Sequence, residues 1–389
     1  MAQTVSQLPL APEVAEPLVI TDREPNRIRR EDLVAHDWYR FVLSFPPHLV
    51  REYIDRFDLG GNSVVLDPFC GTGTTLVESQ RHGIQSIGVE GNPVAHFASS
   101  VKTDWSPNPD ELVEHAEQVS ALASELLAET GLRRLPEEPQ ALLLGHSISD
   151  RPLHKTLILL EALQRRVSLR LARHERLALA KALVFTISNL EFGPEIGVGR
   201  PKEDAPVIES WLAGVQAMAR DLEVLAGLGA PRAVVHLGDA RQVTRQIPAN
   251  SVDAVITSPP YPNEKDYTRT TRLESVVLGF VRSKQDLRAL KQGLVRSNTR
   301  SVYKDDSDDL LVADNDDIQD IAEAIEKRRM ELNKGSGFER LYARLTRLYF
   351  GGMQRHLGDL RRVLRPDARL AYVVGDQASY LQVLIRTGQ

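Results

Sequence analysis

The sequence predicts an α/β protein built on a Rossmann-like, mainly parallel sheet with a helical insertion. Short apolar runs at 64–67, 86–90 and 252–256 have the composition of buried parallel strands. The first run passes through a glycine turn into a helix that begins near Thr75, which is the strand–turn–helix order of such sheets. Between the second and third runs, residues 108–228 carry apolar side chains at three- and four-residue spacing, which predicts helices.

The composition is that of an ordinary globular protein. The chain has 389 residues, of which 42% are hydrophobic and 26% charged, so it can bury a large core in one elaborated domain or two. There is neither an apolar run of eighteen residues nor a signal-peptide pattern, and we expect a cytoplasmic protein without a membrane contact. The net charge of −5 does not indicate nucleic acid, although a protein that binds DNA through one cleft needs to be basic only locally.

Several chemistries lack sequence support. The single cysteine, Cys70, excludes an intramolecular disulfide and a multi-cysteine zinc site, and its place inside the glycine turn suits a small packing residue better than a nucleophile. The ten histidines show no metal-ligand spacing, so we expect no metal. Neither a GxxxxGK[ST] loop nor a GxSxG elbow occurs, which leaves phosphoryl transfer and serine hydrolysis without a motif.

The amino-terminal part leads into the glycine turn. Residues 1–30 are polar and aperiodic and predict a mobile arm, and Phe45-Pro46-Pro47 precedes a helix at 48–57. In the turn that follows, glycine suits a site where a ligand approaches the backbone, and the helix start offers unpaired N–H groups to an anion. The strand at 86–90 ends on Glu90, where a Rossmann-like fold places its ribose-binding acid.

The sheet resumes after the helical insertion. A strand at 233–238 ends on Asp239, which can either contact a ligand at the carboxyl edge of the sheet or cap the following helix. The loop at 193–202 of the insertion either covers the ligand site or touches DNA, or the insertion serves only for packing. A long helix is predicted at 338–363 and a last clear strand at 369–374, with a doubtful strand at 381–385.

The charge changes sharply after the strand at 252–256. Residues 265–304 contain ten Lys or Arg and three Asp or Glu, whereas residues 305–326 contain ten Asp or Glu and neither Lys nor Arg. We expect phosphate contacts in the basic stretch because it directly follows the turn at 257–261. The acidic stretch is a solvated loop, repels DNA from wrong approaches, or folds against the basic stretch.

Two motifs carry a family resemblance. DPFCGTGTT at 67–75, followed by TSPPY at 257–261, resembles the DNA amino-methyltransferases, which move a methyl group from S-adenosylmethionine to an exocyclic base nitrogen. The resemblance implies a class I methyltransferase fold, the cofactor S-adenosyl-L-methionine and double-stranded DNA as partner, and it leaves open whether a cognate restriction endonuclease exists. That fold has a seven-stranded sheet ending in an antiparallel hairpin, whose last strands are here replaced, supplied by a partner or missing.

The resemblance also implies a set of site residues. The catalytic residues are Ser258, Pro259, Pro260 and Tyr261. The cofactor-binding residues are Phe45, Pro46, Asp67, Phe69, Gly71, Gly73, Thr74, Thr75, Glu90, Asp239 and Ala240. Among these, Glu90 is expected at the ribose hydroxyls and Asp239 at the adenine amino group. From the local charge we add DNA contacts at Lys265, Arg269, Arg272, Arg296, Arg300 and Lys304.

The expected organisation is an arm at 1–30, a catalytic domain at 31–105 and 232–389, a helical insertion at 106–231, and a DNA-contacting segment at 265–335. Serine at position 258 is usual in the cytosine-N4 members of the family, whereas adenine-N6 members usually carry Asp or Asn. We therefore expect a site-specific cytosine-N4 DNA methyltransferase that flips its target base. The alternatives are adenine N6, a base in RNA, and a non-catalytic DNA-binding subunit of this fold.

Overall fold

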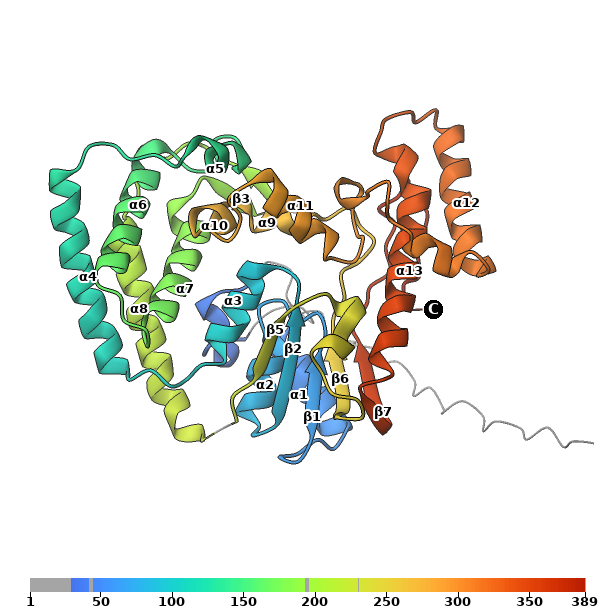
Figure 1. The fold of residues 1–389 in the computed structure, drawn as a ribbon, viewed down its shortest axis with the longest axis horizontal. Helices are drawn as coiled ribbons and strands as arrows, with labels where there is room; N and C mark the ends of the chain where they lie inside the picture. Colours follow the sequence, from blue (N-terminus) through green and yellow to red (C-terminus); the bar gives the residue numbers. More distant parts are fainter. Residues whose placement is uncertain (1–28, 42–44, 193–195, 230, 389) are drawn as a thin grey trace, which may run out of the picture.

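A five-stranded parallel sheet forms the centre of the molecule (Figure 1). The computed structural model describes residues 29–41, 45–192, 196–229 and 231–388. The strands run in the order β5-β2-β1-β6-β7, and every neighbouring pair is parallel. Their bounds are β1 Val64–Asp67, β2 Gln85–Glu90, β5 Val234–Leu237, β6 Val252–Thr257 and β7 Leu364–Tyr372. This is the Rossmann-like parallel sheet that the sequence predicts, but among the described residues its β7 side does not continue into the antiparallel hairpin of a seven-stranded sheet.

The first β–α–β unit follows directly from the sequence. Helix α1 (Pro47–Arg56) precedes β1, and α2 (Thr74–Arg81) connects β1 to β2. Helix α3 (Pro93–Lys102) begins after Asn92, whose side chain accepts a hydrogen bond from the Val94 N–H, and it carries proline at its first position. The predicted arm at 1–30 lies almost entirely outside the described residues.

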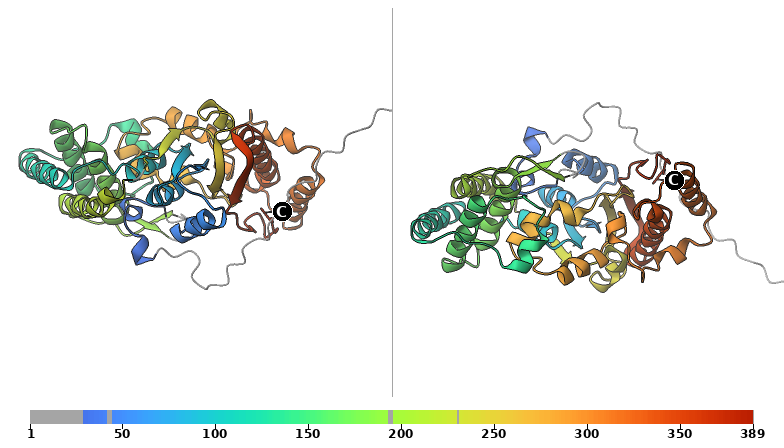
Figure 2. Two further views of the ribbon diagram at one scale, coloured as in Figure 1. Left: turned by 90° about the horizontal axis from the view of Figure 1, so that it is seen from below. Right: turned by 90° about the horizontal axis from the view of Figure 1, so that it is seen from above.

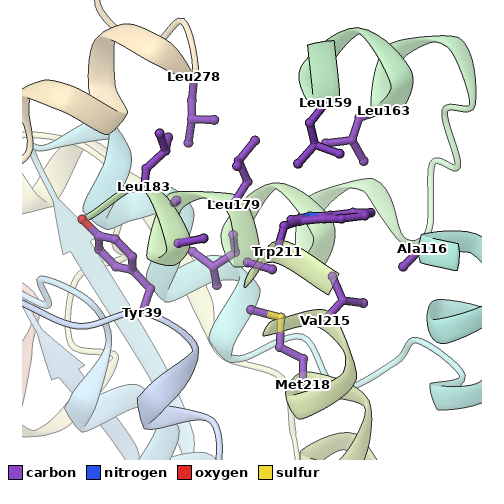
Figure 3. Close-up of a cluster of buried hydrophobic side chains, with 14 of the residues drawn as sticks. Tyr39, Ala116, Leu159, Leu163, Leu179, Leu183, Trp211, Val215, Met218 and Leu278 are labelled. Carbon is purple, nitrogen blue, oxygen red and sulfur yellow. The ribbon is translucent and has the colours of Figure 1, made fainter. Parts of the chain in front are cut away.

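The helical insertion packs as a layer at one end of the sheet (Figures 1 and 2). It contains α4 Pro109–Glu129, α5 Glu137–Leu142, α6 Asp150–Arg165, α7 Ala172–Ala182 with a π-helical turn at Leu183–Ile187, the hairpin β3 Leu190–Phe192 and β4 Ile196–Val198, and α8 Val207–Leu225. Trp211 is fully buried at its centre and donates from Nε1 to the Glu175 carbonyl at 2.9 Å. Figure 3 shows Tyr39 and Leu278 beside this cluster, so the insertion shares its core with the sheet domain.

After β6 the chain first crosses above the carboxyl edge of the sheet beside the insertion, and then covers the side of the sheet opposite the insertion (Figures 1 and 2). After β6 come α9 Tyr267–Thr270, α10 Arg272–Val277, α11 Lys284–Gln292, the short turns η6 Thr299–Ser301 and η7 Asp308–Val312, α12 Asp316–Glu331, η8 Glu339–Leu341 and α13 Tyr342–Leu360. Helix α13 lies against η7, and an added Cβ at Gly351 would overlap the Asp308 carbonyl oxygen. Glycine is therefore needed there for close packing.

Three boundaries differ from the sequence expectation. The helix expected at 338–363 is α13, preceded by a short 3-10 turn, and the strand expected at 369–374 begins earlier, at Leu364. The doubtful strand at 381–385 is only one antiparallel bridge between Gln377 and Ile385. Its residues Val383 and Ile385 instead pack with α12 and α13. The preceding Tyr380 belongs to the same cluster and stacks on Tyr342 at 4.8 Å between ring centroids.

Candidate functional site

A cavity of about 390 Å³ lies at the carboxyl edge of the sheet. One wall comes from α1 and the turns after β1, β2 and β5, and the other comes from the loop after β6 and from residues 291–301. Gly71 and Ser258, which follow the neighbouring strands β1 and β6, both line it. The two motifs of the sequence therefore meet at one site, as parallel strands require of the loops at their carboxyl ends.

Glycine is required at the two glycine positions of the first motif for different reasons. Gly71 has φ +51°, and a Cβ built on it would find only the Phe69 carbonyl oxygen, 4.0 Å away, so this position faces open space in the cavity. Gly73 has φ +87°, and its Cβ would lie 2.9 Å from Cβ of Ser99 on α3. The expectation that a ligand requires both glycines is therefore corrected for Gly73, which does not line the cavity and is required by the packing of α3.

Asp67 and Thr75 join β1 to β6 instead of lining the cavity. The fully buried Asp67 carboxylate accepts hydrogen bonds from Thr257 Oγ1 at 2.6 Å and from the Phe69 N–H at 3.1 Å. Thr75 Oγ1 donates to the Ile256 carbonyl at 3.1 Å. Burial raises the pKa of Asp67 to about 6. These contacts shape the site from behind.

Glu90 lines the cavity where the sequence predicts a ribose-binding acid. Its Oε2 accepts from the Gly71 N–H at 2.8 Å, and its Oε1 accepts from the Asn92 N–H at 2.7 Å. Burial raises the pKa of this carboxyl group to about 7, against the lowering effect of the two backbone donors. The acid therefore also holds the glycine turn in place.

The sequence allows Asp239 either to contact a ligand or to cap the following helix, and the structure shows the cap. Asp239 caps the following turn η5 (Ala240–Arg245) by accepting from the Arg241 N–H at 2.9 Å. The buried Arg241 guanidinium binds both oxygens of this carboxylate, with Nη2 at 2.7 Å from Oδ2. Asp239 does not line the cavity, whereas its neighbour Ala240 does.

The loop after β6 opens onto the cavity. Ser258, Pro259, Pro260 and Tyr261 all line it. Ser258 Oγ donates to the Val373 carbonyl at 3.0 Å and lies 3.2 Å from the Tyr261 hydroxyl, while the Val373 N–H donates to the Thr257 carbonyl at 2.8 Å. Because the serine proton points to Val373, an oxygen lone pair remains to accept a hydrogen bond from a ligand.

Four further residues that the sequence predicts as cofactor contacts line the cavity. Phe45 and Pro46 line it from the start of α1, Phe69 from the turn after β1, and Thr74 from the start of α2. The Thr72 hydroxyl beside them is buried without a hydrogen-bond partner in the described part of the chain. An unmatched polar group of this kind is expected where a ligand completes the site.

The basic stretch divides into buried and exposed residues. The expectation of DNA contact is corrected for Arg272 and Arg296, which are only 9% and 4% exposed. Arg272 donates to the Thr268 carbonyl at 3.1 Å, and Arg296 forms a two-pronged ion pair with Asp306. Both guanidinium groups therefore serve the fold.

The other four predicted contacts remain accessible in part or in full. Lys265 lines the cavity and Arg269 is half-buried, whereas Arg300 and Lys304 are exposed. The Arg300 guanidinium lies over the Phe338 ring at 5.7 Å from its centroid.

The acidic stretch folds against arginines. Asp306 pairs with Arg296 of the basic stretch, as one of the three interpretations of the sequence expects. Asp308 is 7% exposed and binds Arg241 at 2.7 Å and Arg355 at 3.2 Å. This part of the acidic run is therefore internal.

Several lining residues carry no sequence signal. Lys291 sits on the amphipathic helix α11, yet its ammonium turns inward to Asp266 at 2.9 Å. Asn298 Oδ1 is buried without a partner among the described residues, and Nδ2 of the same amide donates to the Lys265 carbonyl at 3.4 Å. Glu264 fixes this region by accepting from the N–H and the hydroxyl of Thr299. Only the tertiary fold brings Lys291 and Asn298 to the cavity.

Comparison with known proteins finds similarity to DNA methyltransferases. The family described as DNA methylase matches residues 24–98. The Type II methyltransferase M.BsoBI of Geobacillus stearothermophilus is 28% identical over 395 residues, covering 90% of this chain and 75% of that protein. This chain is a relative of the DNA amino-methyltransferases.

Two further relatives match a shorter stretch. The Type II methyltransferase M.MjaII of Methanocaldococcus jannaschii is 37% identical over 69 residues, which are 18% of this chain and 13% of that protein. The Type II methyltransferase M.MvaI of Kocuria varians is 31% identical over 72 residues, which are 18% of this chain and 16% of that protein. No solved structure matches the chain.

The cavity fits the cofactor that methyltransferases of this type generally use, S-adenosylmethionine. Gly71 leaves space above the turn, Phe69 offers an aromatic face, and the carboxylate of Glu90 can accept from hydroxyl groups. In the described ranges there is no group of three or more His, Cys, Asp or Glu placed to hold a metal ion. Nor does any helix in these ranges have the length and apolarity needed to cross a bilayer.

Proposed function

We propose that this protein transfers the methyl group of S-adenosylmethionine to the N4 amino group of cytosine in double-stranded DNA, at a specific site and on a base swung out of the duplex. The observation that carries the proposal is that Gly71 and Ser258 line one cavity at the ends of the adjacent strands β1 and β6. The relationship to DNA amino-methyltransferases supports the reaction class.

The residues of the loop after β6 suit an amino group as nucleophile. A base amino group is weakly nucleophilic because its lone pair is delocalised into the ring. Ser258 Oγ and the Pro259 carbonyl each accept one of its N–H groups, which favours a pyramidal nitrogen whose lone pair points at the methyl group. The fixed φ of proline holds the carbonyl in one direction, and the hydrogen bond to Val373 holds the serine.

Tyr261 supports the flipped base. Its ring lines the same cavity, and base–aromatic stacking contributes about 1–3 kcal/mol. This interaction offsets much of the few kcal/mol that extrusion of a base costs.

The cofactor lies against the other wall, over Gly71 and between Phe45, Phe69 and Glu90. The cofactor supplies an electrophilic methyl group on a positively charged sulfur. An aromatic face beside that charge adds roughly 0.5–2 kcal/mol of cation–π attraction. Glu90 accepts hydrogen bonds from the ribose hydroxyls, while Pro46, Thr74 and Ala240 complete the wall. Asp67, Gly73 and Thr75 act behind the cavity, and Asp239 acts through its neighbour Ala240.

Cytosine N4 is proposed because serine occupies position 258 in the SPPY sequence. Adenine N6 is the alternative, since both bases present an amino group on a similar ring. The sheet domain comprises residues 31–105 and 232–389. In this proposal its segment 265–335 contacts DNA through Lys265, Arg269, Arg300 and Lys304. The helices at 106–231 remain an insertion that packs on this domain.

The test is transfer of tritiated methyl groups from S-adenosylmethionine to duplex DNA or to transcripts, followed by nucleoside analysis. N4-methylcytosine in DNA supports the proposal, whereas N6-methyladenine or a modified ribonucleoside replaces the substrate and keeps the chemistry. Sequencing of native DNA from cells that express the chain then gives the recognised site. A protein that binds no S-adenosylmethionine contradicts the enzymatic function and favours a DNA-binding subunit.

A further inference from the structure

A histidine outside both motifs connects two loops and the end of a strand at the carboxyl edge of the sheet. His356 lies on α13, is fully buried, and approaches the Ala240 carbonyl with Nδ1 at 2.7 Å and the Tyr372 hydroxyl with Nε2 at 2.6 Å. Its ring meets the Phe69 ring edge to face, with 4.9 Å between centroids. Phe69 follows β1, Ala240 follows β5, and Tyr372 ends β7.

The hydrogen bonds determine the state of the imidazole ring. A backbone carbonyl can only accept, so Nδ1 carries the proton and donates it to Ala240. Nε2 is then the acceptor, and the Tyr372 hydroxyl donates to it. Burial lowers the pKa of His356, which agrees with a neutral ring having one donor and one acceptor. Both nitrogens are matched, and the ring has one orientation.

The two groups that this ring contacts on the cavity side are cofactor-wall residues. Phe69 and Ala240 line the cavity, whereas neither His356 nor Tyr372 does. We infer that His356, oriented by Tyr372, is a positioning residue that sets the Phe69 ring and the Ala240 backbone for S-adenosylmethionine. This inference rests on the proposed function, because it concerns the cofactor wall of the same cavity.

The test compares three variants of the full chain by the affinity for S-adenosylhomocysteine, measured by calorimetry. His356→Leu removes both hydrogen bonds, and we expect about tenfold weaker binding, equivalent to about 1.4 kcal/mol. His356→Gln keeps one donor and one acceptor, and we expect it to stay within about threefold of the wild type. Tyr372→Phe removes only the orienting bond and is expected between the two. His154→Leu, a buried histidine of the insertion that does not line the cavity, is the matched control and leaves the affinity unchanged.

Two further measurements, the KM for DNA and the temperature of thermal unfolding, distinguish a positioning effect from a general loss of stability. Positioning raises the dissociation constant of the cofactor analogue in His356→Leu and leaves the KM for DNA unchanged. Wild-type affinity in His356→Leu overturns the inference, and so does an equal loss in His356→Gln and His356→Leu.

Amide hydrogen exchange of the ligand-free protein keeps this test independent of the proposed function. His356→Leu should speed exchange about tenfold at 69–73 and 239–242, and His356→Gln should not. Unchanged exchange in His356→Leu overturns the inference even if the wild type binds no cofactor analogue. Failure of the wild type to bind, with faster exchange in His356→Leu, contradicts the proposed function alone.

Discussion

Asp67 and Thr257 are 190 residues apart in the sequence and are joined by a hydrogen bond of 2.6 Å between the carboxylate and the hydroxyl. The bond lies where β1 and β6 end, so it fixes the glycine turn relative to the loop that begins at Ser258. A hydrogen bond behind the cavity thus joins the two loops of the proposed site directly. The consequences of this arrangement can be tested residue by residue.

Ser258→Ala should lower turnover while leaving cofactor binding nearly intact. The hydroxyl that accepts an amino N–H is lost, and removal of one such hydrogen-bonding group at a transition state typically costs about 10²–10³-fold in kcat. Single-turnover methyl transfer and S-adenosylhomocysteine affinity should be measured together. A comparable fall in cofactor affinity would contradict the role assigned to the serine.

Gly71→Ala and Gly73→Ala should fail in different ways. At Gly71 the added methyl group enters open space on the cavity side, so we expect weaker cofactor binding in addition to about 1–2 kcal/mol of backbone strain. At Gly73 the methyl group meets Ser99, so loss of stability should dominate. Denaturant unfolding and cofactor titration of both variants distinguish the two effects. Equal stability losses with unchanged affinity at Gly71 would remove that residue from the cofactor wall.

The sequence predicts the β–α–β unit and the meeting of the two motifs, because these depend on local patterns and on the parallel direction of the strands. It does not predict that Arg296 turns inward, because a charged residue in a basic stretch has the same composition whether its partner is Asp306 or solvent. The two candidate roles of Asp239 likewise depend on Arg241, whose guanidinium is also held by Asp308 of η7 and by the Gln292 carbonyl at the end of α11. His356 has no motif around it, and only the packing of α13 brings it to Phe69.

Cofactor affinity should increase with pH between 6 and 8. The pKa of Glu90 is raised from 4.5 to about 7, so the folded protein binds this proton more tightly than the unfolded chain does. This group therefore reduces the stability of the ligand-free protein as pH rises from about 4.5 to 7. Ribose hydroxyls donate to the ionised carboxylate, so binding below pH 7 must also release the proton.

The check is S-adenosylhomocysteine affinity at closely spaced pH values in wild type and Glu90→Gln. The variant should bind weakly and lose most of the dependence, leaving only a smaller effect from Asp67, whose pKa is about 6. A flat wild-type profile would argue against Glu90 as the ribose acceptor.

Arg296→Ala should destabilise the protein. The change leaves Asp306 without its two-pronged partner, and removing one member of a buried ion pair typically costs about 3–5 kcal/mol. Denaturant unfolding at pH 7 measures the loss, with the exposed Arg300→Ala as the control. If Arg296→Ala unfolds like the wild type and only DNA affinity falls, then the side chain is a phosphate contact after all.

Charge reversal of Arg300 and Lys304 should weaken DNA binding and flatten its salt dependence. Both side chains are exposed beside the segment that forms the cavity wall, so they can reach phosphates without disturbing the fold. Every phosphate that a cation no longer neutralises reduces the slope of log affinity against log salt by about 0.9, so a double reversal should reduce it by about two. Arg361→Glu is the control. This exposed arginine does not line the cavity and lies between α13 and β7, three residues before that edge strand begins. A slope that stays the same in the double variant would move the phosphate contacts to another surface. The helical insertion is the next candidate, because its helix α5 contacts α10, which follows the cavity-lining loop after β6.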